Sequence, residues 1–374
     1  MRVVIAFDKF KGSVTSSQLN EAARQALAGC MGVEVVCVPV ADGGDGTTDA
    51  LAQVSQGHWV TVPAIGPLVQ MEPVTARYFM CDDATALVEV AAASGLALLQ
   101  PRDFDVMHAT TLGTGMLMRD AIERGSRHIV LGLGGSATCD AGMGILCAFG
   151  AEFKDDQGRY LYPCGESLGR ISHIETSGIP QEICDCHFTI LIDVDTYLCG
   201  ECGTARLFAS QKGASAAQVE QLDRGLANVA AIVGAGIAHL KGCGAAGGIP
   251  ALMMHLFDAE LMQGAPYVFE RNGMVPALAG ADLVITGEGR LDQQTLMGKG
   301  PGFVISMARQ RSIPVAAVCG SVDADFDANS AGLDDCIAVS DGLPLEEAMD
   351  AGSTLQRVSH AVRQLIEKKA SGQV

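Results

Sequence analysis

Positive charge is scarce in this sequence of 374 residues: 25 Lys and Arg residues face 43 Asp and Glu residues, and the formal net charge is -18. Such a field repels a long phosphate backbone or an anionic membrane surface, so neither nucleic acid nor a membrane is expected as a general partner. Any small anionic ligand must therefore be bound by local cations.

Long apolar runs are also missing. No segment is apolar enough to span a bilayer, and the short apolar run before Asp8 is too short for a signal peptide. The 13 cysteines are spread over a long chain, so most should be reduced and buried. The sequence predicts an ordered cytoplasmic protein, long enough for two or three domains.

One group of cysteines has the spacing of soft metal ligands. Cys184 and Cys186 form C-x-C, Cys199 and Cys202 form C-x-x-C, and His187 lies beside the first pair. The group could hold zinc or act as a redox dithiol. We favour incidental cysteines in the interior, because C-x-C is an uncommon half-site and no second C-x-x-C completes the set.

Short apolar runs alternate with longer amphipathic stretches along the chain. The predicted buried strands are 2–7, 33–40, 128–133, 188–194, 281–287, 314–320 and 335–340. The predicted helices are 16–28, 110–124, 216–240, 301–311 and 344–368. This order indicates an α/β fold with parallel sheets. Residues 58–90 instead alternate like antiparallel strands, and residues 151–187 form a polar connection.

Polar residues follow the predicted strands, where open α/β sheets bind their ligands. These segments begin at Asp8, Asp42, Gly134, Asp193 and Gly287. We expect them to form one composite site.

The segment LGLGGSATCD, residues 131–140, which we call the glycine loop, resembles a phosphate-binding loop between a strand and a helix. Backbone N–H groups and the helix start would face an anion, and glycine would allow close approach. The cradle would comprise Gly134, Gly135, Ser136 and Thr138, and the thiol of Cys139 at the helix start should have a lowered pKa. The segment is not a Walker loop and matches GxGxxA only loosely. A tight turn with glycines for packing is the alternative.

Charged residues in three further glycine-bearing loops complete a set suited to phosphoryl transfer. Such a reaction needs cations on phosphates, acidic ligands for Mg2+, a base near the attacking hydroxyl and loops that close. The loops contribute Asp42, Asp45, Arg206, Lys212, Glu288, Arg290, Asp292 and Lys299. Asp42 and Asp45 could alternatively serve turn and N-cap chemistry.

Eight motifs, in order, resemble the bacterial ATP-dependent glycerate kinase family, of the type that yields 2-phosphoglycerate. They are IAFDKFKGS, PVADGGDGT, VEVAAASGL, TTLGTGMLM, LGLGGSATCDAGMG, ASQKGAS, GCGAAGGIPA and TGEGRLDQQTLMGKGP. The resemblance implies a Rossmann-like parallel-sheet domain formed from both chain ends (1–62 plus 280–374) and a second α/β domain inserted between them (63–279), with the active site in the cleft. It also implies ATP, Mg2+ and D-glycerate. The chain departs from the family's APDSFK, GSATND and DVTNPL, having AFDKFK, GSATCD and DVDTYL.

The roles that we assign follow from this resemblance. Lys9, Lys11 or Arg290 would hold the carboxylate of glycerate, and Asp8 or Asp42 would deprotonate its C2 hydroxyl. Asp193 or Glu288 would bind Mg2+, with Asp45 also in the catalytic set. Lys212 or Lys299 would offset developing charge.

Two other functions stay open on the residues alone. A nucleotide-dependent oxidoreductase of a small hydroxy acid would need an acidic residue about 20 positions beyond the glycine loop, where Asp155 and Asp156 lie in an exposed turn. The other is a noncatalytic small-molecule binding protein. The oligomeric state is open, with a homodimer as one alternative.

Overall fold

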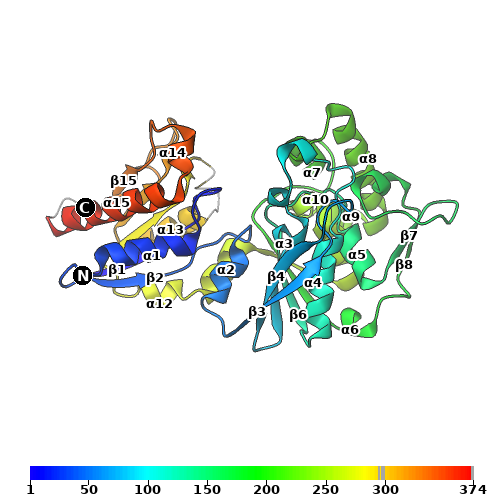
Figure 1. Cartoon of the computed structure of the whole chain (residues 1–374), viewed down its shortest axis with the longest axis horizontal. Helices are drawn as coiled ribbons and strands as arrows, with labels where there is room; N and C mark the ends of the chain where they lie inside the picture. Colours follow the sequence, from blue (N-terminus) through cyan, green and yellow to red (C-terminus); the bar gives the residue numbers. More distant parts are fainter. Residues whose placement is uncertain (294, 296–299, 372–374) are drawn as a thin grey trace. The chain divides into compact units, whose positions relative to one another are not determined.

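The computed structural model describes residues 1–293, 295 and 300–371. The chain divides into two compact units, which we treat separately (Figure 1). The terminal unit comprises Met1–Asp42, Asp49–Val54 and Ala265–Val374. The inserted unit comprises Gly43–Thr48 and Ser55–Gly264. No described helix combines the length and apolar character needed to cross a membrane.

The terminal unit is built on a parallel sheet of five strands in the order β15-β13-β11-β1-β2. The strands are β1 (Arg2–Phe7), β2 (Glu34–Cys37), β11 (Leu283–Gly287), β13 (Val315–Cys319) and β15 (Asp335–Ala338). In the register of β1 and β11, Phe7 pairs with Gly287. The residues that follow these two strands therefore leave the sheet at the same edge.

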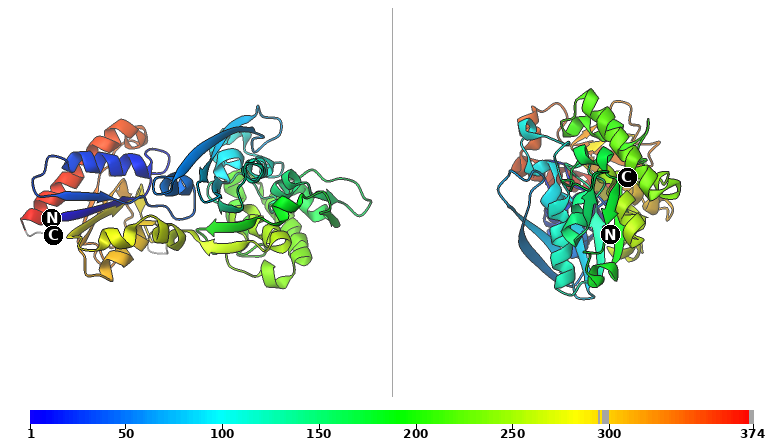
Figure 2. Two further views of the ribbon diagram at one scale, coloured as in Figure 1. Left: turned by 90° about the horizontal axis from the view of Figure 1, so that it is seen from below. Right: turned by 90° about the vertical axis from the view of Figure 1, so that its right-hand side faces the viewer.

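Alternation along β1 explains why helices cover both faces of this sheet. Val3 and Ile5 point to one core cluster and Val4 and Ala6 to another, as the two-residue period of a strand requires. The first cluster includes helices α1 (Ser16–Leu27) and α15 (Ala351–Ala370), and the second includes α11 (Gly264–Arg271), α12 (Met274–Leu278) and α13 (Gly300–Arg309). Figure 2 shows the two groups on opposite sides of the sheet. The predicted helix 344–368 is divided into α14 (Leu345–Met349) and α15 at Asp350, the N-cap of α15.

The inserted unit contains a mixed sheet of six strands in the order β10-β9-β6-β5-β4-β3. Its strands are β3 (Gly57–Ala64), β4 (Val74–Cys81), β5 (Thr85–Glu89), β6 (His128–Gly132), β9 (His187–Ile192) and β10 (Glu260–Gln263). β3, β4 and β5 are antiparallel neighbours, which confirms the prediction for residues 58–90. β5, β6, β9 and β10 run parallel.

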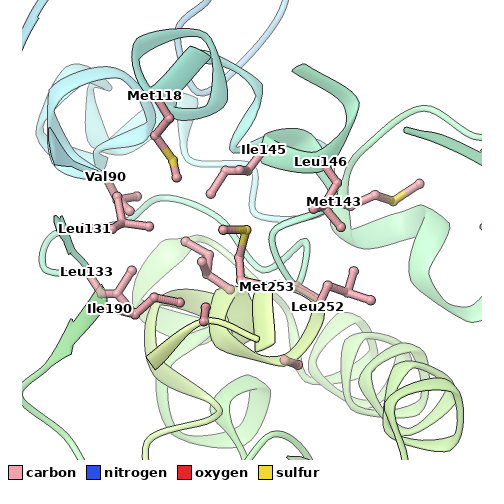
Figure 3. Packing of buried hydrophobic residues seen from close by; sticks show 14 of the residues in the cluster. Val90, Met118, Leu131, Leu133, Met143, Ile145, Leu146, Ile190, Leu252 and Met253 are labelled. Carbon is pink, nitrogen blue, oxygen red and sulfur yellow. The ribbon is translucent and has the colours of Figure 1, made fainter. Parts of the chain in front are cut away.

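Helices pack against this sheet and form a large apolar core with it, part of which appears in Figure 3. Met118, Leu131 and Met253 lie together in this view, from a helix, a strand and a second helix. The main helices are α4 (Leu112–Glu123), α5 (Met143–Phe149), α8 (Ala216–Val233) and α10 (Ala245–Phe257). Shorter elements are α3 (Ala91–Ser94), α6 (Gln181–Cys184), α7 (Thr204–Phe208), α9 (Ala235–Ala238) and the hairpin of β7 (Glu152–Lys154) and β8 (His173–Glu175). The mixed α/β class with parallel sheets is thus confirmed.

The unit boundaries differ from the predicted domain boundaries after residues 62 and 279. Strand β3 pairs with β4 along its whole length, which places it in the inserted unit. Phe269 and Met274 belong to a core cluster of the terminal unit, so α11 and α12 stay with that unit. Strand pairing and helix packing decide both boundaries, and neither can be read from local sequence patterns.

Candidate functional site

The first group of predicted residues lies at the carboxyl edge of the terminal sheet. Asp8 follows β1, and its backbone N–H donates to the carbonyl of Gly287 at 2.9 Å. Asn20 on α1 accepts from the N–H of Phe7 and donates to the carbonyl of Val38. This buried amide therefore holds the end of β1 to the segment that follows β2 and leads to Asp42.

Asp8 has the electrostatics of a proton acceptor. Its side chain is only 9% exposed, and burial, then the nearby charges of Asp42 and Glu288, raise its pKa to about 7. Lys9 opposes the shift through its charge and through its N–H, which donates to Asp8 Oδ1 at 2.7 Å. Asp42 and Glu288 therefore lie near enough to Asp8 for their charges to act on its carboxyl group.

Glycines let two other loops approach Asp8. A Cβ atom on Gly300, the first residue of α13, would lie 3.3 Å from Asp8 Oδ2 and 2.6 Å from a methyl group of Val40. A Cβ atom on Gly289 would lie 3.4 Å from the backbone nitrogen of Lys11. These close approaches bring the start of α13 and the loop after β11 beside the loop after β1.

Two charged residues of the loop after β11, Glu288 and Arg290, interact with side chains of the terminal unit. Glu288 Oε1 accepts a hydrogen bond from the hydroxyl of Thr295 at 2.7 Å, which holds this carboxylate in place. Arg290 is largely exposed and forms an ion pair with Asp323 at 2.6 Å. Arg290 therefore already has a partner within the terminal unit. Lys299, the other predicted cation of this loop, lies outside the described residues.

The second group belongs to the inserted unit and surrounds the glycine loop. Gly135 has φ +70, a conformation that favours glycine. A Cβ atom on Gly134 would lie 2.2 Å from the backbone nitrogen of Asp45, so Gly134 is required for packing. Both observations fit the alternative of a tight turn with glycines for packing: Gly135 allows the turn, and Gly134 admits the segment that carries Asp45. The phosphate cradle stays a prediction.

Lys212 is buried beneath this loop. Its Nζ donates to Ser136 Oγ and to the carbonyl of Thr138, both at 2.8 Å, and the side chain is 5% exposed. Burial lowers the pKa of Lys212 to about 8, although the neighbouring acidic groups of Cys139 and Asp140 oppose the shift. The hydroxyl of Thr138 is buried without a hydrogen-bond partner among the described residues. The structure thus brings the predicted site residues Lys212, Ser136 and Thr138 together, and their roles on phosphate stay predictions.

The helix start after the loop is not available to a phosphate, contrary to our expectation. Helix α5 begins only at Met143, and the fully buried carboxylate of Asp140 accepts hydrogen bonds from the N–H groups of Gly142 and Gly144. Asp140 also accepts from the N–H and hydroxyl of Thr111, before α4. An internal carboxylate thus takes the place that we assigned to the ligand.

The prediction of a reactive Cys139 is wrong for a related reason. The residue precedes α5 by several positions, and its side chain is only 2% exposed. Burial raises the pKa of its thiol to about 12, which keeps it protonated. A low thiol pKa needs a helix start or a partly exposed cationic environment, and Cys139 has neither.

The predicted magnesium ligands are not brought together in one unit. Asp193 is exposed after β9 of the inserted unit, whereas Glu288 belongs to the terminal unit. Within the described parts of the chain, no three His, Cys, Asp or Glu residues are grouped as metal ligands, and all 13 cysteines are free thiols.

Glu89 is a site residue that the sequence reasoning missed. It is the last residue of β5, and its carboxylate accepts from the backbone N–H groups of Gly46 and Thr48. Its only sequence signal was a polar residue at a strand end, within the VEVAAASGL motif.

Acidic and basic side chains follow parallel strands of the terminal unit, and the acidic Glu89 and Asp193 stand at strand ends of the inserted unit, where α/β sheets bind ligands. Fold and site thus define an α/β protein equipped to bind a small polar ligand. The sequence model of the Glycerate kinase family matches residues 3–367, and the chain belongs to this family. The sequence-based identification of a kinase is confirmed.

Individual relatives agree with this assignment. The chain is 37% identical over 335 residues to the Glycerate 2-kinase of Escherichia coli K12, covering 87% of this chain and 86% of the relative. It is 36% identical over 356 residues to a Glycerate kinase of Bacillus cereus, covering 93% of each. A crystal structure from Salmonella typhimurium LT2, of a protein provisionally named glycerate kinase 2, has a TM-score of 0.83 at 34% identity and covers 100% of this chain and 99% of that one.

Proposed function

We propose that the protein transfers the γ-phosphoryl group of ATP to the C2 hydroxyl of D-glycerate, with Mg2+ as cofactor, and releases 2-phosphoglycerate. Family membership supports the reaction class, and the relative from Escherichia coli is named for 2-kinase activity. The structural observation that carries the proposal is the buried Asp8 carboxyl, whose pKa of about 7 suits a general base at neutral pH.

In this proposal Asp8 accepts the proton of the C2 hydroxyl as that oxygen attacks the γ-phosphorus in line. Asp42 and Glu288 favour proton uptake by Asp8, since their negative charges raise its pKa. Lys9 and Lys11 lie one and three positions after Asp8 and supply positive charge for the carboxylate of glycerate. Arg290 is a weaker candidate for this role, because it already pairs with Asp323.

We assign the phosphates of ATP to the glycine loop of the inserted unit. Lys212 retains most of its positive charge at pH 7, since its pKa lies near 8. Through Ser136 and Thr138 it fixes the loop and supplies the nearby cation that a transferring phosphoryl group needs.

Magnesium, when bound, would neutralise charge on the phosphate groups of ATP. The acidic side chains fit this ion, because Mg2+ keeps several waters and binds through one or two carboxylates. Asp193 or Glu288 is the proposed ligand, with Asp42 or Asp45 as the alternative. Free thiols at all 13 cysteines are typical of a reducing compartment, and we propose the cytoplasm.

The test is ADP release from the purified protein with ATP, Mg2+ and D-glycerate. We expect turnover that requires all three, and a 31P spectrum that shows the 2-phosphate. A product that carries only the 3-phosphate would overturn the positional assignment, and no glycerate-dependent ADP release would overturn the function.

The same preparation with NAD in place of ATP tests the oxidoreductase alternative. We expect no reduction of NAD. Asp155, which lies near the position of a ribose-binding acid, is buried and accepts hydrogen bonds from Arg159, Arg170 and two backbone N–H groups. Asp155 therefore stabilises a turn. These contacts, together with family membership, favour the kinase over the oxidoreductase.

A further inference from the structure

Glu89 forms two hydrogen bonds to a short segment that is far away in sequence. Its Oε2 accepts from the N–H of Gly46 at 3.1 Å, and its Oε1 accepts from the N–H of Thr48 at 2.6 Å. The segment Gly43–Thr48 belongs to the inserted unit although the chain on both sides of it belongs to the terminal unit. Glu89 is thus one of the groups that fasten this segment to the inserted unit.

The fastened segment lies against the glycine loop. A Cβ atom on Gly132 would be 3.3 Å from both Glu89 Cγ and the carbonyl oxygen of Gly43. A Cβ atom on Gly135 would be 3.8 Å from Asp45 Cβ, so the side chain of Asp45 begins beside the turn of the loop. Any shift of the segment would therefore move Asp45 relative to the glycine loop.

A carboxylate suits this position better than other side chains. Both neighbours are backbone N–H donors, so the position needs two acceptor oxygens on one planar group. Glutamine offers one acceptor and turns an NH2 group toward the second donor. Aspartate keeps the charge but is one methylene shorter, so it cannot span both donors without a backbone shift.

We propose that Glu89 is a positioning residue: it holds Asp45 beside the glycine loop and thereby supports phosphoryl transfer. This inference rests on the proposed function for its catalytic part. The contact itself is independent of that function and is tested separately.

The first experiment is a double-mutant cycle of Glu89→Gln and Asp45→Asn, followed by kcat. Glu89→Gln loses a hydrogen bond to a charged group, and we expect kcat to fall about ten- to a hundred-fold. If Glu89 acts through Asp45, Glu89→Gln should change kcat less than about two-fold when Asp45→Asn is already present. Equal losses in both backgrounds, or wild-type kcat in folded Glu89→Gln, would overturn the proposal.

Asp155→Asn is the matched control. Asp155 is a buried carboxylate of the same unit that also accepts from two backbone N–H groups, those of Gln157 and Arg159. Its removal should lower the melting temperature and leave kcat unchanged. A similar loss of kcat in Asp155→Asn would show that general destabilisation explains the effect.

The second experiment needs no activity. Hydrogen exchange at the amides of Gly46 and Thr48 should be faster in Glu89→Gln than in the wild type, with an intermediate rate in Glu89→Asp. If the wild type fails to phosphorylate glycerate while exchange responds, the proposed function fails and the contact stands. If exchange does not respond, the positioning role fails. Should Glu89→Gln not fold, the kinetic cycle is repeated with Glu89→Asp, for which unchanged kcat and exchange would be contrary to the proposal.

Discussion

Asp42 and Asp45 are separated by two glycines, yet Asp42 belongs to the terminal unit and Asp45 to the inserted unit. The first contributes to the raised pKa of Asp8, and the second lies beside Gly135 of the glycine loop. A single turn of the chain thus supplies one acidic residue to each unit.

Gly43, at this crossing, should tolerate no side chain. Its φ is +96, and a Cβ atom would lie 2.7 Å from the backbone Cα of Gly264, where the chain crosses between the units again. We expect Gly43→Ala to lower the free energy of unfolding by at least about 3 kcal/mol, measured by urea denaturation. Gly158→Ala is the control, since Gly158 has φ +74 but open space around it, and its loss should be about 1 kcal/mol.

Ser136→Ala tests whether the buried lysine and the glycine loop act together. The change removes the Ser136 hydroxyl, which accepts a hydrogen bond from Lys212, and should lower the free energy of unfolding by about 1.5 to 3 kcal/mol. If the loop holds phosphates, kcat/KM should fall about ten- to a hundred-fold. Ser126→Ala, which removes another fully buried hydroxyl of the inserted unit, should affect stability alone. Wild-type kinetics in folded Ser136→Ala would refute the phosphate role of this hydroxyl.

The pH dependence of kcat/KM should be bell-shaped. Asp8 must be deprotonated to accept a proton, so activity should rise with pH through about 7. Lys212 must be protonated to offset phosphate charge, so activity should decline as pH increases through about 8. Steady-state rates between pH 5.5 and pH 9.5 measure both limbs. A profile that is flat over this range would contradict both assignments.

Asp8→Asn should abolish turnover and should change the stability of the protein in a pH-dependent manner. The folded-state pKa of Asp8 is raised from 3.8 to about 7, so the stability that this group contributes is fully present below about pH 4 and is lost as pH rises through 7. Relative to the wild type, the melting temperature of Asp8→Asn should therefore increase between pH 4 and pH 7 and then level off. Turnover should be lost throughout. A constant difference in melting temperature would mean that Asp8 does not titrate in this window.

The parallel strands were predictable because burial on both faces leaves a continuous apolar signal. Residues 2–7 and 281–287 were predicted, and the strands are Arg2–Phe7 and Leu283–Gly287. Helix 216–240 was predicted as one element, but it ends at Gly234, where φ is +83 and the chain starts the short α9. A glycine within a helical pattern does not by itself reveal that change of direction.

The local chemistry of the site was less predictable than its location. Strand ends indicated where polar groups would gather, and this pattern predicted Asp8, Asp42 and Glu288 as site residues. The roles of Asp140 and Glu89 depend on partners 29 and 41 or more residues away, Thr111 and the segment that contains Gly46 and Thr48. Such pairings arise only once the sheet has formed, so neither the composition nor the spacing of residues predicts them.

The pairing of β1 with β11 also sets the order in which the molecule can be made. The first strand synthesised is completed only by a partner at residues 283–287, whereas residues 55–264 are contiguous and can form their own sheet earlier. At about 5 to 20 residues per second, β1 waits on the order of 15 to 55 seconds on the ribosome for its neighbour. During that interval β2 is the only other strand of this sheet that has been synthesised, so the apolar segment VVIAF lacks its partner on one side. This is when we expect the protein to depend most on chaperones.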